Sequence, residues 1–282
     1  MKQGYHQFRV QDEDTDKTAF ITRRGQFKFV KMLFGLCNAV SSFQRGMDLI
    51  LAGLNLNVCM VFLDNIVLFS RTPEEHLQRL ETLLERFKEA NLKLKPSKCK
   101  LLQTEVEFLG HIVSKDGIAT NPKKIQLVKD WPEPTNLKQL RGYLGLTGYY
   151  RRFIKDYSKV ALPLTNLLKK NAPFNWTQDC QDAFDDLKRM MSPPVLTLPN
   201  KNDTFILDTD ASDSNIGAVL SQRQDGQERV IAYAGRVLTT NEKNYCVTRK
   251  ELLAVVYFLS TFDNTCWDDS SSCALTTLHC PG

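Results

Sequence analysis

The sequence lacks any long apolar run. No stretch approaches the roughly 18–20 residues that a membrane-spanning helix needs, so we expect no membrane partner. The first residues, 1–6, contain no apolar core of the kind that a secretory signal carries. The expectation is therefore an intracellular chain in the cytoplasm or nucleus, not a secreted one, with its thiols reduced.

Metal-binding cysteine patterns are also missing. The eight cysteines form no CxxC pair, and the four histidines form no cluster beside them, which argues against a zinc site. Internal repeats and low-complexity segments are absent. The composition is that of an ordinary globular chain, with 42% hydrophobic and 24% charged residues, and 282 residues suggest about two domains. The net charge of +5 permits a nucleic-acid partner without requiring one.

Strand and helix signals alternate along the chain. Alternating residues predict a strand over 5–10, and Arg24-Gly25 predicts a hairpin turn between strands 18–22 and 26–30. Thr72 and Glu75 form the pattern of a capping box at the start of a helix. The other expected helices lie at 41–50, 135–150 and 250–258. A strand pair is expected over 106–113, and further strands at 205–207, 216–220 and 230–233.

An acidic residue stands between two apolar strands. The runs 58–63 and 66–69 flank Asp64-Asn65, which predicts a hairpin with this pair as its turn. A carboxylate held rigidly at such a tip, with solvent on one side, suits Mg²⁺ binding. Asp-Asn is also simply a good turn pair, and the spacing alone leaves both interpretations open.

A longer series of motifs gives more information, because several occur in a fixed order. They are Lys17-Thr18-Ala19-Phe20, Phe34-Gly35-Leu36-Cys37-Asn38-Ala39, Phe43-Gln44-Arg45, Phe62-Leu63-Asp64-Asn65, Phe108-Leu109-Gly110-His111 and Tyr149-Tyr150-Arg151-Arg152-Phe153. The series resembles the reverse transcriptase of a gypsy-type LTR retrotransposon. Further motifs, Asp210-Ala211-Ser212, Gly217-Ala218-Val219-Leu220 and Lys250-Glu251-Leu252-Leu253-Ala254, resemble the ribonuclease H domain that follows it. The resemblance covers residues 1 to about 262.

The resemblance implies an RNA-directed DNA polymerase that uses two Mg²⁺ ions, dNTPs and an RNA and DNA template-primer. The family holds the ions with one Asp in its first motif and an Asp-Asp pair in the hairpin. Here Asp64 keeps the first carboxylate of that pair, whereas Asn65 is a neutral amide. The first-motif Asp is expected immediately before Met1, so the sequence predicts a catalytically impaired polymerase site.

The resemblance also assigns binding roles. Tyr5 matches the residue that screens the nucleotide sugar, Phe34-Gly35 the nucleotide pocket, and Phe108-Leu109-Gly110-His111 the primer grip; Gln44 belongs to a further matched motif. Arg151 and Arg152 would meet phosphates from the thumb. Each has a structural alternative: a core aromatic for Tyr5, a turn for Phe34-Gly35, a satisfied strand-end imidazole for His111, and a solvated helix end for the arginines.

In the ribonuclease H part, Asp210 and Glu251 match two metal-binding carboxylates. Glu251 also lies three residues after Thr248, the spacing of a capping box. The next family carboxylate stands in a Thr-Asp-His string, which this chain does not contain. We therefore expect an incomplete Mg²⁺ site here as well.

The amino-acid composition changes after Phe262: residues 263–282 contain three Cys and no Lys or Arg. Back-translated and regrouped by one nucleotide, residues 265–270 permit the Tyr-Leu-Leu-Gly-Arg string expected of the family, and Trp267 forces its second Leu and its Gly. Residues 274–277 regrouped permit Thr-Asp-His. The tail therefore resembles the family's gene translated in the wrong reading frame. Because this tail would replace the expected fourth strand of the ribonuclease H-like domain, we expect one edge of the sheet to be unpaired.

The expected fold is α/β (α+β). Its predicted parts are a right-hand palm remnant over 1–115, a helical thumb and connection over 116–192, a truncated ribonuclease H-like domain over 193–262, and a frame-shifted tail over 263–282. The predicted function is that of a retrotransposon Pol fragment with reverse transcriptase and ribonuclease H domains. The alternative is a non-catalytic nucleic-acid-binding protein derived from a retrotransposon.

Overall fold

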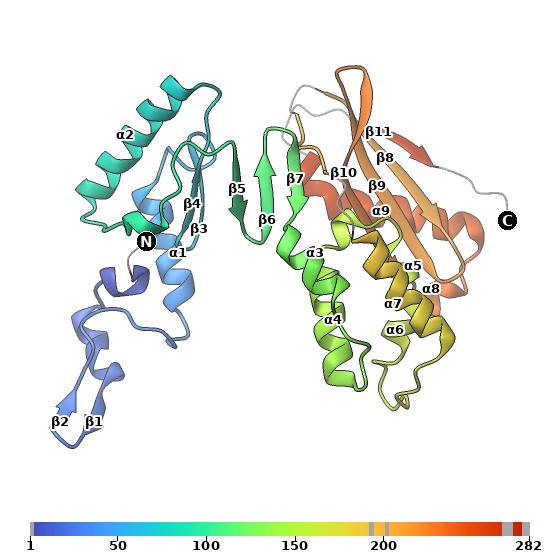
Figure 1. Ribbon diagram of the computed structural model, residues 1–282, viewed down its shortest axis with the longest axis horizontal. Helices are drawn as coiled ribbons and strands as arrows, with labels where there is room; N and C mark the ends of the chain where they lie inside the picture. The colour runs from blue at the N-terminus through green and yellow to red at the C-terminus, as the bar shows by residue number, and fades with distance from the viewer. Residues whose placement is uncertain (1–2, 192–194, 201–202, 267–272, 278–282) are drawn as a thin grey trace. The chain divides into compact units, whose positions relative to one another are not determined.

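The computed structural model describes residues 3–191, 195–200, 203–266 and 273–277 (Figure 1). The chain divides into two compact units, Met1–Phe108 and Leu109–Gly282. Each unit mixes helices with strands, which confirms the predicted fold class. The second unit contains both the helical region and the ribonuclease H-like region, so the finer division into domains stays a prediction. Among the described residues, no helix has the length and apolarity to cross a membrane.

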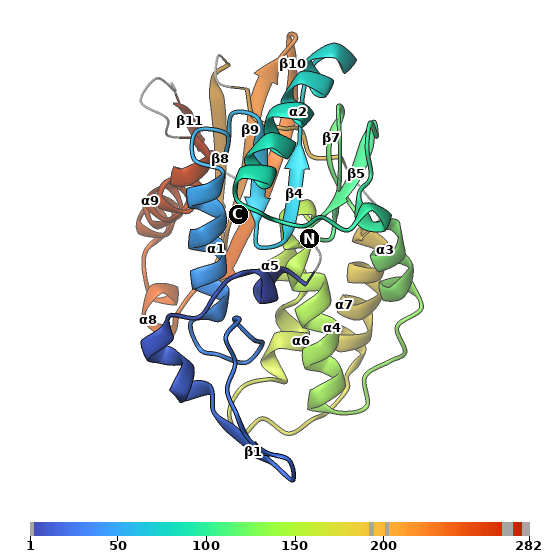
Figure 2. The same cartoon turned by 90° about the vertical axis from the view of Figure 1, so that its left-hand side faces the viewer.

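The first unit contains most of the residues predicted to form the palm. Its elements are η1 (Gly4–Gln7), η2 (Asp12–Thr18), β1 (Phe20–Thr22), β2 (Gly25–Phe27), α1 (Ala39–Ile50), β3 (Cys59–Phe62), β4 (Asn65–Leu68), α2 (Pro73–Glu89), η3 (Pro96–Lys98) and β5 (Glu105–Phe108). Helices α1 and α2 lie beside the β3–β4 hairpin (Figure 2). Phe43 and Met47 from α1, Cys59 from β3, and Leu83 and Phe87 from α2 form the buried core.

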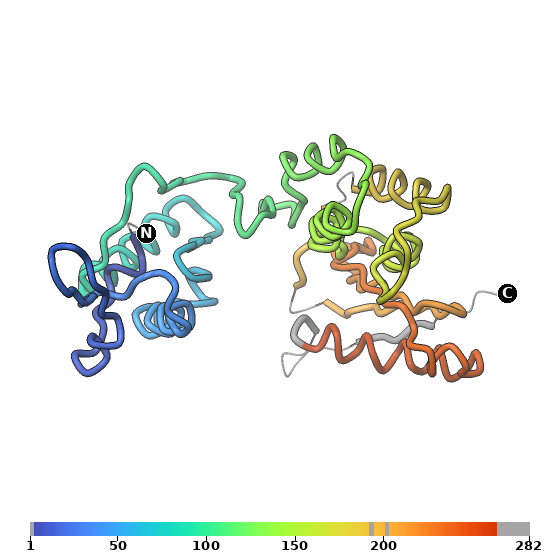
Figure 3. The backbone as a smooth tube through the Cα atoms, turned by 90° about the horizontal axis from the view of Figure 1, so that it is seen from below, coloured from blue at the N-terminus to red at the C-terminus, as the bar shows by residue number. Residues whose placement is uncertain are grey.

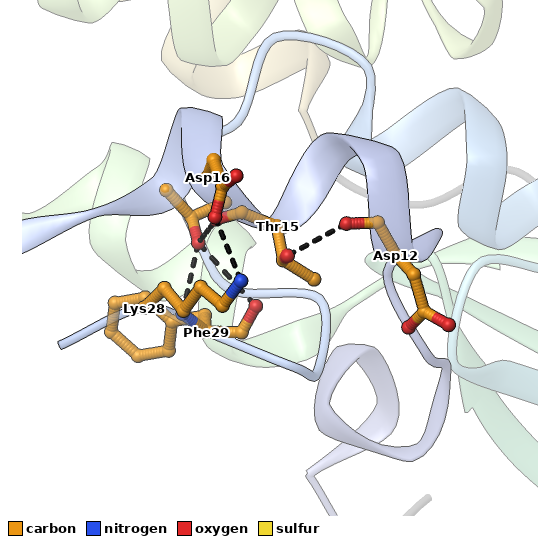
Figure 4. A network of polar contacts seen from close by, with 6 residues as sticks. Asp12, Thr15, Asp16, Lys28 and Phe29 are labelled. Atoms are coloured by element: carbon orange, nitrogen blue, oxygen red, sulfur yellow. Dashed lines mark hydrogen bonds and ion pairs between the residues drawn. The ribbon is translucent and has the colours of Figure 1, made fainter.

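The β1–β2 hairpin extends from this core and is anchored by polar contacts at its base. Phe29 donates its backbone N–H to Thr18 Oγ1 at 2.9 Å, and Lys28 Nζ lies 2.7 Å from Asp16 Oδ1. Within the 3-10 helix η2, the Thr15 hydroxyl donates a hydrogen bond to the Asp12 carbonyl at 2.8 Å (Figure 4). The hairpin predicted around Arg24-Gly25 is confirmed, with Thr22 paired to Gly25.

The strand predicted over residues 5–10 is wrong, because Gly4–Gln7 form the 3-10 helix η1. The rings of Tyr5 and Phe8 both meet Phe43 edge-on, with centroids 5.0 and 5.1 Å away. Residues three apart share one face of a helical turn but point to opposite faces of a strand. Packing both rings on Phe43 therefore requires the helical turn.

The second unit begins with an antiparallel hairpin and continues as a helical layer. Its elements to residue 190 are β6 (His111–Ser114), β7 (Gly117–Thr120), α3 (Pro122–Lys129), α4 (Leu137–Tyr149), η4 (Arg151–Phe153), α5 (Tyr157–Val160), α6 (Leu162–Asn166) and α7 (Gln178–Met190). Tyr143, Tyr150, Leu164 and Leu187 are fully buried in the core between these helices. The helix predicted over 135–150 is confirmed as α4, which begins after Asn136; the Asn136 Oδ1 accepts the Gln139 N–H at 3.0 Å.

A sheet in the order β10–β9–β8–β11 completes this unit. The elements are β8 (Phe205–Ala211), β9 (Asn215–Gln224), β10 (Gln227–Val237), α8 (Thr240–Lys243), α9 (Val247–Cys266) and β11 (Cys273–Thr277). The three predicted strands and the helix after them are confirmed. Helix α9 covers one face of the sheet, and the green and yellow helices lie on the other (Figure 3). Leu207 and Leu220 pack under α9, whereas Tyr233 packs against the helical layer.

Two expectations about this region are wrong. First, the sheet edge at β8 is paired, because residues Cys273–Thr277 of the tail form β11 parallel to β8, with Cys273 opposite Phe205. Backbone pairing does not depend on which side chains the tail carries. Second, Thr248 does not cap its helix, since α9 already begins at Val247.

Candidate active sites

The hairpin that carries Asp64 has a different turn from the predicted one. Phe62 pairs with Asn65, so the two loop residues are Leu63 and Asp64, and Asn65 begins β4. Leu63 has a left-handed backbone, with φ of 54°. Such a conformation costs energy in a non-glycine residue and persists where the surroundings impose it. Here the Leu63 N–H donates to Gln44 Oε1 at 2.6 Å.

Gln44 therefore has a structural contact that the motif alone did not reveal. Its amide nitrogen donates to Asp48 Oδ1 at 2.9 Å, one helical turn along α1, while its oxygen accepts from the turn. Both polar atoms of the Gln44 amide group are thus engaged in hydrogen bonds, which fixes the side chain. It couples α1 to the loop on which the Asp64 carboxylate stands.

The N-terminal segment lies beside Asp64. A Cβ placed on Gly4 would stand 3.8 Å from the Asp64 Cβ and 3.0 Å from the Phe43 ring. Tyr5 meets Phe34 edge-on, with ring centroids 4.9 Å apart. Phe34 is 65% exposed, and Gly35 beside it has φ of 92°, a conformation that favours glycine. The structure thus brings Tyr5, Phe34-Gly35 and Asp64 to one place, as a nucleotide pocket would need.

The chemistry of this place is set by Asp64 and Asn65, which are both exposed. A carboxylate and an amide oxygen are hard oxygen donors of the kind that Mg²⁺ binds, but only the carboxylate carries charge. Within the described part of the chain, no group of three His, Cys, Asp or Glu side chains is placed to hold a metal ion. The donor set on these residues does not amount to a two-metal site.

The predicted primer-grip motif spans the boundary between the units, with Phe108 ending β5 and the next residues beginning the second unit. Leu109 and Gly110 form a turn with φ of 47° and 75°. His111 follows in β6, and its ring stacks on those of Tyr149 and Phe153, with centroids 5.3 and 5.4 Å away.

The imidazole of His111 sits in a poorly solvated place. Burial, aided by the charge of Arg152, lowers its pKa below the ordinary histidine value. Its Nδ1 is buried without a hydrogen-bond partner. This unsatisfied nitrogen argues against the interpretation of His111 as a satisfied strand-end imidazole.

Arg151 and Arg152 lie in η4, at the end of α4, and both side chains are exposed. Their neighbours on the chain, Tyr150 and Phe153, are buried at 1% and 3% exposure. The corner therefore turns Tyr150 and Phe153 inward. Arg151 is exposed, while Arg152 lies partly over the Phe153 ring, where burial lowers the pKa of its guanidinium. Exposed guanidinium groups on a rigid corner are available for phosphate.

In the ribonuclease H-like region, Asp210 stands near the end of β8 and is exposed. Its cross-strand partner on β9 is Gly217, whose missing side chain leaves room beside the carboxylate. The Asp156 carboxylate approaches from the position just before α5, with Oδ1 3.5 Å from where a Gly217 Cβ would be. Sequence reasoning missed this residue, because Asp156 is far from Asp210 along the chain.

An ion pair links the strand that carries Asp210 to the helix that carries Glu251. Lys250 Nζ donates to Asp213 Oδ1 at 2.8 Å, and this hydrogen bond lowers the pKa of Asp213. Asp213 lies in the turn just after Asp210, and Lys250 precedes Glu251 on α9. The ion pair thereby links the turn that follows β8 to the start of α9, the two elements that carry Asp210 and Glu251.

Asp208 is a further acidic residue that the motifs did not single out. It lies two positions before Asp210 and so on the same face of β8. Burial, and secondarily the charge of Glu228, raises the pKa of its carboxyl. Strand alternation from Asp210 could have revealed this position from the sequence.

Known proteins with these features fall in one class. Residues 1–113 match the family model for reverse transcriptase (RNA-dependent DNA polymerase), and residues 176–272 match the model for an RNase H-like domain found in reverse transcriptase. The chain therefore carries a reverse transcriptase domain and an RNase H-like domain. Both families generally use divalent metal ions.

Sequence relatives of the whole chain give a more specific comparison than the two family models. The chain is 42% identical over 265 residues to the retrovirus-related Pol polyprotein from transposon 297 of Drosophila melanogaster, covering 93% of this chain and 25% of that protein. It is 36% identical over 277 residues to the Pol polyprotein from transposon gypsy of the same organism, covering 94% and 26%. The chain is thus similar to gypsy-type retrotransposon Pol polyproteins, and it spans about a quarter of the length of these relatives.

Solved structures confirm the fold. The foamy viral protease-reverse transcriptase dRH in complex with ds DNA matches 96% of this chain and 48% of its own, with a TM-score of 0.86 and 21% identity. The foamy viral protease-reverse transcriptase in complex with RNA/DNA hybrid covers 96% and 37%, with a TM-score of 0.84 and 21% identity.

Proposed function

We propose that this chain is a template-primer-binding segment of an RNA-directed DNA polymerase with ribonuclease H, and that its polymerase site is impaired. The observation that carries the proposal is the joining of Tyr5, Phe34 and Asp64 in one place on the first unit. In this proposal Tyr5 and Phe34 contact the sugar of an incoming dNTP, and Asp64 provides the negative charge that one Mg²⁺ requires. Bound Mg²⁺ would supply charge stabilisation during nucleotidyl transfer.

Asn65 is the reason to propose impairment. Its backbone still pairs with Phe62, so the hairpin keeps its form, but the amide adds no charge beside Asp64. A metal ion in a nucleotidyl-transfer site is worth several kcal/mol of transition-state stabilisation, and each 1.36 kcal/mol is tenfold in rate. Losing a charged ligand is therefore expected to lower the rate roughly 10²–10³-fold.

Primer extension tests the proposal. The purified chain is given a primed RNA template, dNTPs and Mg²⁺, and we expect extension at background rate. Asn65→Asp is tested beside the unmodified chain. We expect this variant to recover roughly the 10²–10³-fold in extension rate that the missing charge costs. Asn57→Asp, at an exposed position just before β3, adds the same charge away from the turn and is the matched control. Robust extension by the unmodified chain would overturn the proposed impairment.

A second candidate function is non-catalytic nucleic-acid binding. The exposed guanidinium groups of Arg151 and Arg152 favour it, because phosphate contacts need no metal site. The foamy viral structures hold DNA or an RNA/DNA hybrid, which supports a nucleic-acid partner for this chain also. Binding of a primed duplex by the chain, with no extension by any repaired variant, would favour this candidate.

A further inference from the structure

Two consecutive tyrosines at the end of α4 bond the two carbonyl groups of the Leu109-Gly110 turn. Tyr149 Oη donates to the Leu109 carbonyl, and Tyr150 Oη donates to the Gly110 carbonyl at 2.7 Å. These contacts join positions forty residues apart along the chain. Each peptide plane of the turn is thus held by its own hydroxyl.

The turn needs such support, because its backbone is unusual. Leu109 is left-handed at φ of 47°, a conformation that L-residues adopt at a cost and that the surroundings must impose. Gly110 offers no side chain, and a Cβ placed on it would lie 3.4 Å from Tyr150 Oη. The hydroxyls therefore contact the turn directly and fix the direction of its carbonyls.

The same corner holds the residue after the turn. His111 stacks on Tyr149 with an interplanar angle of 13° and meets Tyr150 edge-on, with ring centroids 5.4 Å apart. Tyr150 is 1% exposed and rigidly packed, while Tyr149 is 53% exposed. One tyrosine therefore anchors the turn to the core, and the other joins it to the solvent-facing corner that carries Arg151 and Arg152.

We propose that the Tyr149 and Tyr150 hydroxyls are positioning groups that hold the Leu109-Gly110 turn in the shape that receives the 3′ end of a primer. This rests on the proposed function in one respect, which is that the chain binds a template-primer. In this role the hydroxyls need touch neither primer nor nucleotide. They act through the backbone of the turn, while the arginines beside them supply affinity for any phosphate.

Hydroxyl-deletion variants test the proposal in the full chain. Tyr149→Phe, Tyr150→Phe and the double variant remove the oxygens and keep the rings. Tyr157→Phe is the matched control, because its hydroxyl bonds Thr147 Oγ1 at 3.0 Å in the same helical layer and does not touch the turn. The readout is the ratio of affinities for a duplex with a recessed primer 3′ end and for a blunt duplex of equal length.

We expect the parent and Tyr157→Phe to prefer the recessed end, and the double variant to lose roughly tenfold of that preference. A double variant that keeps the full preference would overturn the proposal. So would a Tyr157→Phe chain that loses the preference equally, because the effect would then be general destabilisation.

Hydrogen exchange of the free protein separates this proposal from the proposed function. The amides of residues 109–111 should exchange faster in the double variant than in the parent, and those of the Tyr157→Phe chain should not. Unchanged hydrogen exchange of these amides in the double variant would overturn the proposed positioning role of the two hydroxyls, whatever the binding result. A parent chain that binds no primed duplex would overturn the proposed function and, with it, the role in primer placement.

Discussion

Phe43→Ala is expected to detach the N-terminal segment from the palm core. Phe43 is 1% exposed and receives the rings of Tyr5 and Phe8 edge-on. Truncating a buried Phe to Ala costs about 3–5 kcal/mol, and we expect the upper half of this range because two ring pairs are lost as well. A domain is stable by about 5–15 kcal/mol, so the first unit should lose a large share of its stability.

The assay can follow the two units separately. Every tryptophan lies in the second unit, at Trp131, Trp176 and Trp267, so tryptophan fluorescence during urea unfolding reports that unit alone. We expect this signal to be unchanged by Phe43→Ala, while hydrogen exchange of residues 4–8 accelerates. Val40→Ala, at a position 51% exposed on the same helix, is the control and should change stability by less than about 0.5 kcal/mol. Parent-like exchange of residues 4–8 in the Phe43→Ala chain would refute the reasoning.

Three further predictions concern the second unit. Replacing Arg151 and Arg152 by Ala should weaken binding to all duplex sequences about equally and reduce the salt slope by about 2 in anisotropy titrations; a sequence-dependent loss would contradict phosphate contact. Arg236 lowers the pKa of Glu242 from 4.5 to about 2, so the parent should lose stability as the pH falls through this interval. Thermal unfolding of Glu242→Gln should lack that pH-dependent component, and an identical profile would refute the linkage. Adding one nucleotide near codon 263 should produce cleavage of an RNA–DNA hybrid, and cleavage by the unrepaired chain would show that the tail needs no repair.

The sequence predicted most elements because their signals are local. The β3–β4 hairpin, helix α4 and strands β8 to β10 follow from apolar spacing and turn residues, which act over a few positions. The errors came from distant contacts. Residues 4–7 became a 3-10 helix because Tyr5 and Phe8 both pack on Phe43, and the turn moved to Leu63-Asp64 beside the Gln44 side chain. Neither partner is visible in a local window of sequence.

The candidate sites divide in the same way. The motifs identified Asp64, Asp210 and Glu251, since each stands in a recognisable string of residues. They did not reveal the contacts of Tyr149 and Tyr150 with the turn, or the Lys250–Asp213 ion pair. These contacts join separate segments, and a hydroxyl or an ammonium group leaves no periodic pattern in the sequence.

Two of the three predicted catalytic carboxylates, Asp64 and Asp210, stand on a loop and near a strand end that other side chains hold in place. The Gln44 amide fixes the loop of Asp64, and the Lys250–Asp213 ion pair fixes the turn after Asp210. Asn65 changes none of the supporting contacts, because its pairing with Phe62 is made by the backbone. A substitution at this position therefore removes charge without disturbing the scaffold. A single side chain can change activity without changing the fold. Similarity to polymerase structures therefore establishes the fold of the palm, whereas the chemistry of the site depends on residue Asn65.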